Sequence, residues 1–304
     1  MPIDVVTPII EKLDYRQQLK LRNVSKTLRA LVDKQTPACK KISISCSWEC
    51  VDIRFDNCFV TYTSGNGYGN GIKVIRDDFK KAAFDDLAST LKNPKLQLEE
   101  FYLRSATEEK DIVKHCNEFR NVFESLNHQV SAVEAKFHDF SPSCLFSILP
   151  YLKPGKLKKI SLSLYEVRQV FDSAIMHRVA SLEQWKQAEE LEMQLSFDRF
   201  PMKYATHFKR FEIHEHVVNA SRFAGMKNFL AKLDNFEQCT LHFYKFLFNR
   251  DEVDQIVGTL VSCDCSIGLE VFHYPIPDSD CYFEFKVLFT QYKIEIANKK
   301  REIH

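Results

Sequence analysis

Glu212, His214 and His216 are side chains whose types and spacing could hold a metal ion. They alternate with the apolar Phe211 and Ile213, so a strand over this segment would place all three on one face. Imidazole nitrogens and a carboxylate are ligands that zinc accepts. The sequence, however, identifies no fourth ligand and no outer partners for these groups. We therefore expect solvent-exposed histidines on a strand, with no metal site and no cofactor.

The cysteine and glycine patterns suggest two further kinds of site. Cys263 and Cys265 are separated by one residue, whereas structural zinc sites prefer two to four and need a second pair. The segment Gly65–Gly71 carries four of the eight glycines of the chain. A dinucleotide site would need a helix directly after such a loop, but strand patterns lie on both sides of it. We expect buried or loop cysteines, and a mobile hairpin loop at 65–71.

Nucleophilic catalysis would require a nucleophile and a base in a recognisable arrangement. The sequence has no Gly-x-Ser-x-Gly elbow, and no cysteine–histidine pair carries a local signature of a catalytic site. We therefore predict that the chain is not an enzyme.

The elements that would position functional side chains begin with helices in residues 1–33. Two stripes of apolar residues recur with helical spacing. Asp14 and Gln17 fit an N-cap and its capping-box partner, which predicts that the second helix starts near Tyr15. Helices this short bury too little surface to be stable alone, so they must pack on the rest of the chain, on another protein, or on both. The stripes are Val6, Ile9, Ile10 and Leu13, and then Leu21, Val24, Leu28 and Leu31.

Period-two alternation follows the helices and predicts a small antiparallel β meander over residues 41–76. Strand runs are expected near 42–44, 51–55 and 60–62, with a turn at Asp56-Asn57, and strand character returns at 72–75. A helix over 78–92 should then stop before Pro94.

A loose repeat occupies the rest of the chain. An apolar-x-x-apolar-x-apolar strand core recurs at 98–103, 157–162, 188–193, 208–213 and 236–241, with a degenerate copy near 266–271. Helical stretches lie between these cores, and strand-plus-helix units of about 28 residues are typical of leucine-rich-repeat architecture. The expected fold is α+β. A short helical module (1–37) and an antiparallel meander (41–76) precede an irregular LRR-like α/β solenoid (77–304).

Composition limits the partners and the compartment. The formal net charge is +1, which gives no overall attraction to nucleic acid or to an anionic membrane. No apolar run reaches membrane-spanning length, and the start of the chain lacks a signal-peptide pattern. Ten cysteines without a secretory signal indicate reduced thiols. We expect an intracellular protein of the cytoplasm or nucleus that binds neither nucleic acid nor membrane.

The N-terminal segment resembles an F-box. The matching residues are Met1-Pro2, Val5, Ile9-Ile10, Leu13-Asp14, Leu19, 21–26 and 28–33. The resemblance implies a helical module that binds a Skp-type adaptor of a cullin–RING ubiquitin ligase. In that family the proline after the start and apolar helix residues make the contact. Carried over to this chain, the adaptor-binding residues are Pro2, Ile9, Leu13, Leu19, Leu21, Val24 and Leu28.

The order of the segments resembles the nematode F-box A proteins, which carry an FTH (F-box-associated homology) domain. An F-box, a β-rich stretch, the segment 83–94 and LRR-like repeats carry this resemblance over nearly the whole chain. It implies a substrate-recognition subunit that binds the adaptor, and through it a cullin, while the FTH region binds an unknown protein target. The alternative is a non-catalytic scaffold whose N-terminal helices cap the solenoid.

A solenoid presents its strands as one continuous surface, so outward-facing strand residues are the candidates for target binding. Ordinary solvated strand residues are the alternative explanation for these polar positions. By strand parity the candidates are Tyr102, Arg104, Lys159, Ser161, Glu192, Glu212, His214, His216, Thr240 and His242.

Overall fold

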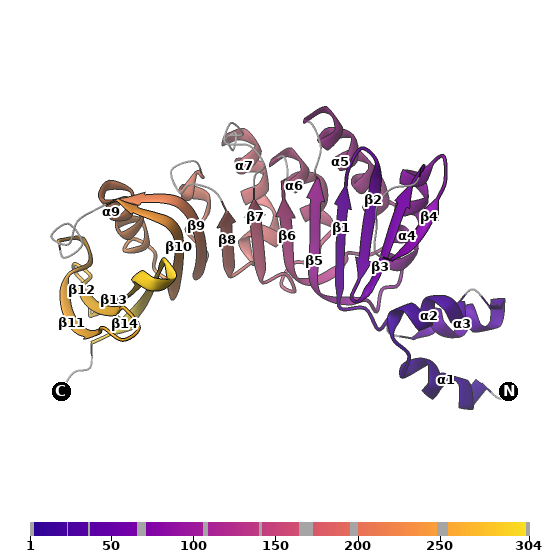
Figure 1. The fold of residues 1–304 in the computed structure, drawn as a ribbon, viewed down its shortest axis with the longest axis horizontal. Helices are drawn as coiled ribbons and strands as arrows, with labels where there is room; N and C mark the ends of the chain where they lie inside the picture. Colours follow the sequence, from indigo (N-terminus) through magenta and orange to yellow (C-terminus); the bar gives the residue numbers. More distant parts are fainter. Residues whose placement is uncertain are drawn as a thin grey trace. The chain divides into compact units, whose positions relative to one another are not determined.

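The computed structural model describes residues 3–22, 24–35, 37–65, 71–105, 109–139, 142–163, 173–194, 200–247 and 255–301. An N-terminal helical segment precedes mixed β-sheet structure with helices packed on it (Figure 1), which confirms the expected mixture of helices and strands. The chain divides into two compact units that we describe separately. The first is chiefly Met1–Ile160 with Arg178–Gln187, and the second is chiefly Ala188–His304 with Ser161–Ser163.

Three helices form the N-terminal segment: α1 (Ile3–Glu11), α2 (Tyr15–Arg22) and α3 (Lys26–Lys34). The capping box is confirmed, because Asp14 Oδ1 accepts from the Gln17 N–H at 2.7 Å and Gln17 Oε1 accepts from the Asp14 N–H at 3.0 Å. The sequence predicted one helix where α2 and α3 lie. A second N-cap divides them, since Ser25 Oγ accepts from the Leu28 N–H at 3.1 Å.

The three helices share one small apolar cluster. Val6, Ile10 and Leu31 are buried in it, and Leu21, Leu28 and Val32 pack against it. A buried aliphatic side chain contributes only about 1.5–3 kcal/mol, which is too little here to offset the entropy of ordering the segment. The helices therefore depend on the sheet beside them.

Tyr15 and Gln18 attach α2 to the rest of the first unit. The Tyr15 hydroxyl hydrogen-bonds Thr90 Oγ1 at 2.7 Å, and its ring lies 5.1 Å from that of Phe55. Burial raises the pKa of Tyr15, which keeps this hydroxyl protonated. Gln18 is 3% exposed. Its Nε2 donates to the carbonyls of Ile10 and Leu13 at 3.2 and 3.3 Å, and its Oε1 accepts from the Ala38 N–H at 3.2 Å.

Two side chains that follow α4 (Phe79–Leu91) cap the carboxyl end of α3. Asn93 Nδ2 donates to the carbonyls of Asp33 and Gln35, both at 3.2 Å, and Lys95 Nζ donates to the Lys34 carbonyl at 2.6 Å. The last carbonyls of a helix have no partner within it, so these bonds satisfy them and fix the direction in which α3 leaves the sheet.

The strands of the first unit are β1 (Lys41–Cys46), β2 (Cys50–Phe55), β3 (Cys58–Thr63), β4 (Ile72–Ile75), β5 (Gln97–Ser105) and β6 (Ser131–His138). Their spatial order is β6-β5-β1-β2-β3-β4. The pairs β1–β2 and β2–β3 are antiparallel, and the predicted turn at Asp56-Asn57 is confirmed. The pairs β1–β5, β5–β6 and β3–β4 are parallel.

The antiparallel meander expected over residues 41–76 is therefore wrong, because the sheet is mixed and β4 runs parallel to β3. Parallel strands cannot be joined by a hairpin, so 65–71 is not the hairpin loop that its glycines suggested. Residues 66–70 lie outside the described residues. Gly71 has a steric role: a Cβ there would come within 2.5 Å of the Phe59 carbonyl oxygen.

Helices α4, α5 (Glu109–Glu124) and α6 (Pro142–Ile148) cover one face of this sheet (Figure 1). Phe84 of α4 meets Phe119 of α5 edge-on at 5.1 Å, and Phe123 meets the strand residue Phe101 edge-on at 5.7 Å. Two short elements complete this unit, η1 (Leu149–Tyr151) and α8 (Glu183–Lys186). Among the described residues, no helix is long and apolar enough to cross a membrane.

The second unit contains β8 (Glu190–Gln194), β9 (Arg210–Asn219), β10 (Gln238–Leu247), β11 (Thr259–Asp264), β12 (Leu269–Pro275), β13 (Cys281–Leu288) and β14 (Lys293–Lys300), in the spatial order β11-β12-β13-β14-β10-β9-β8. Strands β8, β9 and β10 are parallel. The strands from β11 to β14, and β14 with β10, are antiparallel. The strand–helix repeat predicted near 266–271 is therefore wrong, because β11 to β14 form an antiparallel meander there.

Helix α9 (Ala220–Leu230) connects β9 to β10 and supplies part of the core of the second unit. Its Phe223 lies edge-on to Phe285 at 5.9 Å, and its Phe229 lies edge-on to Phe211 at 6.0 Å. The remaining elements are β7 (Lys159–Ser163), α7 (Ser173–Ser181), η3 (Met202–Tyr204) and η4 (Phe289–Gln291).

Most cysteines fit the expectation of reduced thiols. Eight cysteines are free in the part of the chain that the structure describes. Burial raises the pKa of Cys39, Cys46 and Cys239, so these thiols stay protonated and unreactive. Cys116 departs from the expectation, because it is disulfide-bonded.

We predict that replacing Gln18 by alanine loosens the helical segment from the sheet. Gln18→Ala removes the side-chain partner of the Leu13 carbonyl and of the Ala38 N–H, and it leaves the Ile10 carbonyl with only the Leu13 N–H. A buried unsatisfied group costs about 1–3 kcal/mol. Urea denaturation of the full chain, followed by circular dichroism, measures this loss. The control is Lys20→Ala on the exposed side of α2, expected within about 0.5 kcal/mol of wild type. Equal stability of both variants would contradict this role for Gln18.

Candidate functional site

The N-terminal helices expose a group of apolar side chains. Val5 and Ile9 are 51% and 47% exposed and lie four residues apart on α1, so they share one face of the helix. Val24, between α2 and α3, is 70% exposed. Large aliphatic groups in water are a surface that a partner can bury. We call Val5, Ile9 and Val24 the exposed apolar group.

The residues predicted to bind an adaptor divide by burial. Ile9 and Val24 are exposed, whereas Leu21 and Leu28 pack against the internal cluster of the helices. Leu13 is partly buried. Pro2 and the side chain of Leu19 lie outside the part of the chain that the structure describes. The sequence reasoning did not select Val5, although its spacing from Ile9 was the signal that could have found it.

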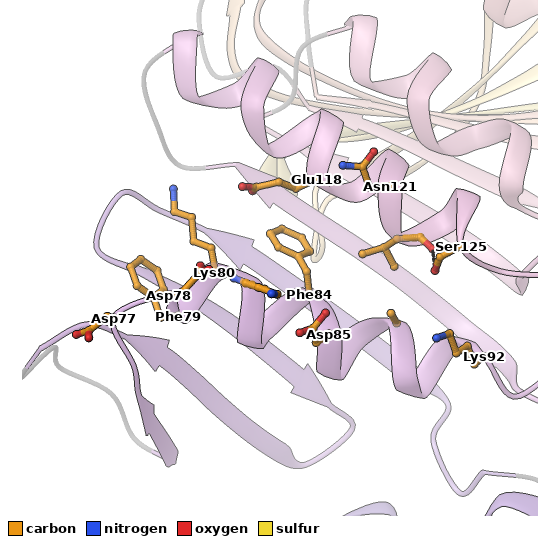
Figure 2. Close-up of a pocket in the computed structure, with 13 residues that line it drawn as sticks. Asp77, Asp78, Phe79, Lys80, Phe84, Asp85, Lys92, Glu118, Asn121 and Ser125 are labelled. Atoms are coloured by element: carbon orange, nitrogen blue, oxygen red, sulfur yellow. Dashed lines mark hydrogen bonds between the residues drawn. The ribbon is translucent and has the colours of Figure 1, made fainter.

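A pocket of about 660 Å³ lies between α4 and α5 in the first unit (Figure 2). Its lining mixes acidic and basic side chains, and Figure 2 shows Lys80 and Glu118 at one end of it with Phe84 at its centre. Lys80 Nζ lies 3.1 Å from His115 Nε2. The pocket was not found from the sequence, because its two helices come together only in the fold. Because its lining carries charges of both signs, the pocket suits the polar surface of a partner better than an apolar ligand.

Polar strand residues of the first unit form a charged network on the sheet. Lys136 Nζ lies 2.7 Å from Glu100 and 3.4 Å from Glu134, and Lys159 Nζ lies 3.5 Å from Glu134. Desolvation opposes the charge on Lys136, but its carboxylate partners prevail and raise its pKa. Lys159, a predicted target-binding residue, thus belongs to a network in which each charge is balanced.

The other candidates of the first unit, Tyr102 and Arg104, lie on β5. The Tyr102 ring is 6.1 Å from the His138 ring, and burial raises the pKa of its hydroxyl. Arg104 Nε donates to Asp139 Oδ2 at 2.9 Å. Both side chains retain exposed surface and remain predicted contacts for a target.

In the second unit, the parallel register of β8, β9 and β10 brings candidates from three strands together. Glu192 pairs with Glu212, Glu212 with Thr240, and His214 with His242. The two imidazole rings stack at 4.6 Å with 15° between their planes. Glu212 Oε1 lies 3.5 Å from Nε2 of both rings, so one carboxylate oxygen lies within ion-pair distance of two histidines. We call Glu212, His214 and His242 the histidine cluster.

The third residue beside Glu212 and His214 is therefore His242, and not His216 as the sequence suggested. His216 is exposed and lies next to Tyr244, with ring centroids 5.6 Å apart. A signal for His242 is present in the sequence. His214 follows the strand core 208–213 and His242 follows the core 236–241, so aligning the two cores aligns the histidines.

Ser161 has a supporting position rather than an exposed one. It is 6% exposed, and its Oγ donates to Glu192 Oε2 at 2.7 Å. Glu192 Oε1 lies 4.0 Å from His214 Nε2. A second carboxylate thus stands beside the histidine cluster, and Ser161 fixes its direction.

Comparison with known proteins finds matches to two segments of this chain. A family model of the F-box domain matches residues 1–40, and a model of the FTH domain matches residues 113–259. A curated relative, F-box A protein 224 of Caenorhabditis elegans, is 24% identical over 230 residues, which cover 70% of this chain and 57% of the relative. The chain thus spans little more than half the length of that relative.

We predict that acidification destabilises the second unit through His242. Burial, and then the neighbouring His214, lower the pKa of His242 below 6.5. The unfolded chain then takes up the proton at a higher pH than the folded chain does. The stabilisation from this group is complete above the unfolded pKa and is lost as the pH falls through the folded one.

The measurement is the thermal midpoint between about pH 7 and about pH 5, the range in which histidine titrates. His242→Gln should flatten the decline that wild type shows, and the control His216→Gln should keep the wild-type slope. Parallel declines in wild type and His242→Gln would refute the assignment.

Proposed function

We propose that this chain, a nematode-type F-box protein with an FTH domain, is the substrate-recognition subunit of a Skp–cullin–F-box ubiquitin ligase. An F-box domain implies a part in recognising substrates for ubiquitination. The observation that carries the proposal is the F-box match over the same residues that form a small, dependent helical segment with an exposed apolar group.

In this proposal the helical segment binds a Skp-type adaptor through apolar burial. Ile9 and Val24, with Val5 beside them, are the side chains that a partner can reach. Leu21 and Leu28 contribute indirectly. They pack against the internal cluster of the helices and so hold Ile9, Val24 and Val5 in place. Pro2, Leu13 and Leu19 complete the proposed contact, and the cullin is reached through the adaptor.

The region matched by the FTH domain is the proposed target-binding part. It contains β6 to β10 and the helices between them. We read these successive strand–helix units as an LRR-like array, in which polar strand residues face a protein target. Tyr244, which is 81% exposed and lies beside His216, adds an aromatic side chain of the kind that dominates binding interfaces.

The chemistry of such a subunit is positional. Holding the target and the adaptor on one chain raises the effective concentration of a target lysine near the conjugating enzyme. This role needs rigid presentation and no catalytic group of its own, and it places the protein in the cytoplasm or the nucleus.

The rival proposal is a non-catalytic interaction scaffold whose N-terminal helices only cap the sheet. Hydrogen bonds that tie the helical segment to the rest of its unit favour it, since a cap needs such anchors. Gln18 Oε1 accepts from the Ala38 N–H, and Asn93 and Lys95 donate to carbonyls at the end of α3. Affinity purification of the full chain from nematode cells separates the two proposals. Adaptor and cullin peptides in the eluate support the ligase subunit, and targets recovered without either of them support the scaffold.

We predict that adaptor binding depends on the exposed apolar group. Val5→Ala with Ile9→Ala removes two anchors, each worth about 1.5–3 kcal/mol if buried in the complex. Adaptor affinity, measured by titration calorimetry, should fall at least tenfold, since about 1.4 kcal/mol is a factor of ten. The control Lys12→Ala, exposed directly after the same helix, should bind as wild type does. Unchanged affinity of the double variant, with its helices intact by circular dichroism, would rule out this surface.

We predict that target capture depends on the pair His216 and Tyr244. Replacing both by alanine should reduce the amount of cross-linked target recovered from cells, while adaptor binding stays constant. The matched control is Trp48→Ala, an aromatic side chain of the first unit that is 71% exposed. If Trp48→Ala loses the target and the double variant keeps it, the recognition surface belongs to the first unit instead.

A further inference from the structure

We infer that Glu212, His214 and His242 form a binding site for a divalent transition-metal ion, best suited to Zn²⁺. The site lies on neighbouring parallel strands β9 and β10 of the second unit. One ligand atom from each residue lies within 4.8 Å of the other two. This inference goes beyond the proposed function and does not rest on it.

The distances match those of a zinc coordination shell. Zinc lies about 2.0–2.2 Å from imidazole nitrogen and carboxylate oxygen, so two ligand atoms of a tetrahedral site lie about 3.3 Å apart. Glu212 Oε1 lies 3.5 Å from Nε2 of His214 and from Nε2 of His242. The carboxylate oxygen therefore already has the separation from each nitrogen that shared coordination requires. The stacked rings must only turn about their side-chain bonds until both lone pairs converge.

The nitrogens are available for a metal. His214 Nε2 is buried and has no hydrogen-bond partner among the described residues, and a buried polar atom without a partner is costly. His242 Nε2 faces the same carboxylate oxygen, Glu212 Oε1, at 3.5 Å. A bound cation would satisfy both nitrogens and the carboxylate at once.

A set of outer contacts orients the site. Glu192 Oε1 is 4.0 Å from His214 Nε2, and Glu192 is held by Ser161 Oγ at 2.7 Å and by Gln194 Nε2 at 3.2 Å. Lys293, which lies opposite His242 in the register of β10 and β14, is paired with Glu295 at 2.6 Å. Two carboxylates beside two imidazoles give a donor set of the kind that a dication binds, and outer partners of this kind are typical of metal sites.

The donor set selects the class of ion. Two imidazoles and a carboxylate suit zinc, whereas calcium and magnesium prefer oxygen ligands. Three protein ligands leave one position of a tetrahedral shell for water or for a donor from a bound molecule. The ion would join β9 to β10, so it would also raise the stability of the second unit by mass action.

The exposed thiols of Cys263 and Cys265, 3.5 Å apart, are the competing metal ligands in this unit. Cobalt(II) distinguishes the two sites, because thiolate ligation gives intense near-ultraviolet charge-transfer bands and a nitrogen–oxygen site does not. The test therefore uses the full chain carrying Cys263→Ser and Cys265→Ser as its parent protein.

The experiment titrates Zn²⁺ into this parent by calorimetry and Co²⁺ by visible spectroscopy. We expect one ion per chain, tetrahedral Co²⁺ bands without thiolate charge transfer, and a higher thermal midpoint with Zn²⁺. His214→Gln and His242→Gln should each weaken binding more than a hundredfold. Glu192→Gln, an outer partner, should weaken it about 10–100-fold. His216→Gln is the matched control and should bind as the parent does.

Two results would overturn the inference. One is binding of Zn²⁺ by His214→Gln and His242→Gln with the affinity of the parent. The other is the absence of binding by the folded parent at micromolar Zn²⁺. Circular dichroism of each variant establishes that it is folded, and none of the replaced side chains belongs to the buried core.

Discussion

The alternation of buried and solvent-facing residues along the strands is the constraint on which the rest of this structure depends. Successive side chains of a strand point to opposite faces, and in each unit the helices occupy one of them. Phe101 and Leu103 in the first unit, and Phe211 and Ile213 in the second, are almost fully buried as a result. Their neighbours must face the other way. Parallel pairing then lines up polar residues from different strands, which is how Glu212, His214 and His242 come together.

The same alternation explains which features could be predicted from the sequence. The strand cores, the capping box of Asp14 and Gln17, and the turn at Asp56-Asn57 are local patterns, and each is found where it was expected. The direction in which two strands pair is not local. Period two is the same in parallel and antiparallel strands, so the sequence could not show that β4 runs parallel to β3 or that β11 to β14 form a meander.

The candidate sites show the same division. Helical spacing identified the apolar stripes of the N-terminal segment, but it could not separate Leu21 and Leu28, which face inward, from Ile9 and Val24, which face outward. That distinction depends on how three helices pack. The pairing of His214 with His242 likewise depends on the register between β9 and β10, which is set by the packing of α9 and the strand cores rather than by the histidines themselves.

Charge on the polar strand residues is balanced over short distances. Arg210, for example, donates to Glu190 at 2.6 Å and to Glu237 at 2.7 Å, and Lys136 lies between Glu100 and Glu134. With a formal net charge of +1, the chain has little long-range field to accelerate encounters. Recognition by such a surface relies on close contact of shape and hydrogen bonds, so its affinity should respond weakly to ionic strength.

The caps that Asn93 and Lys95 place on the end of α3 have a mechanical consequence. A flexible tether would let a bound object explore a sphere whose radius grows with the square root of tether length. Because the hydrogen bonds hold the end of α3 on the first unit, a molecule bound to the helical segment would keep a restricted orientation relative to that unit.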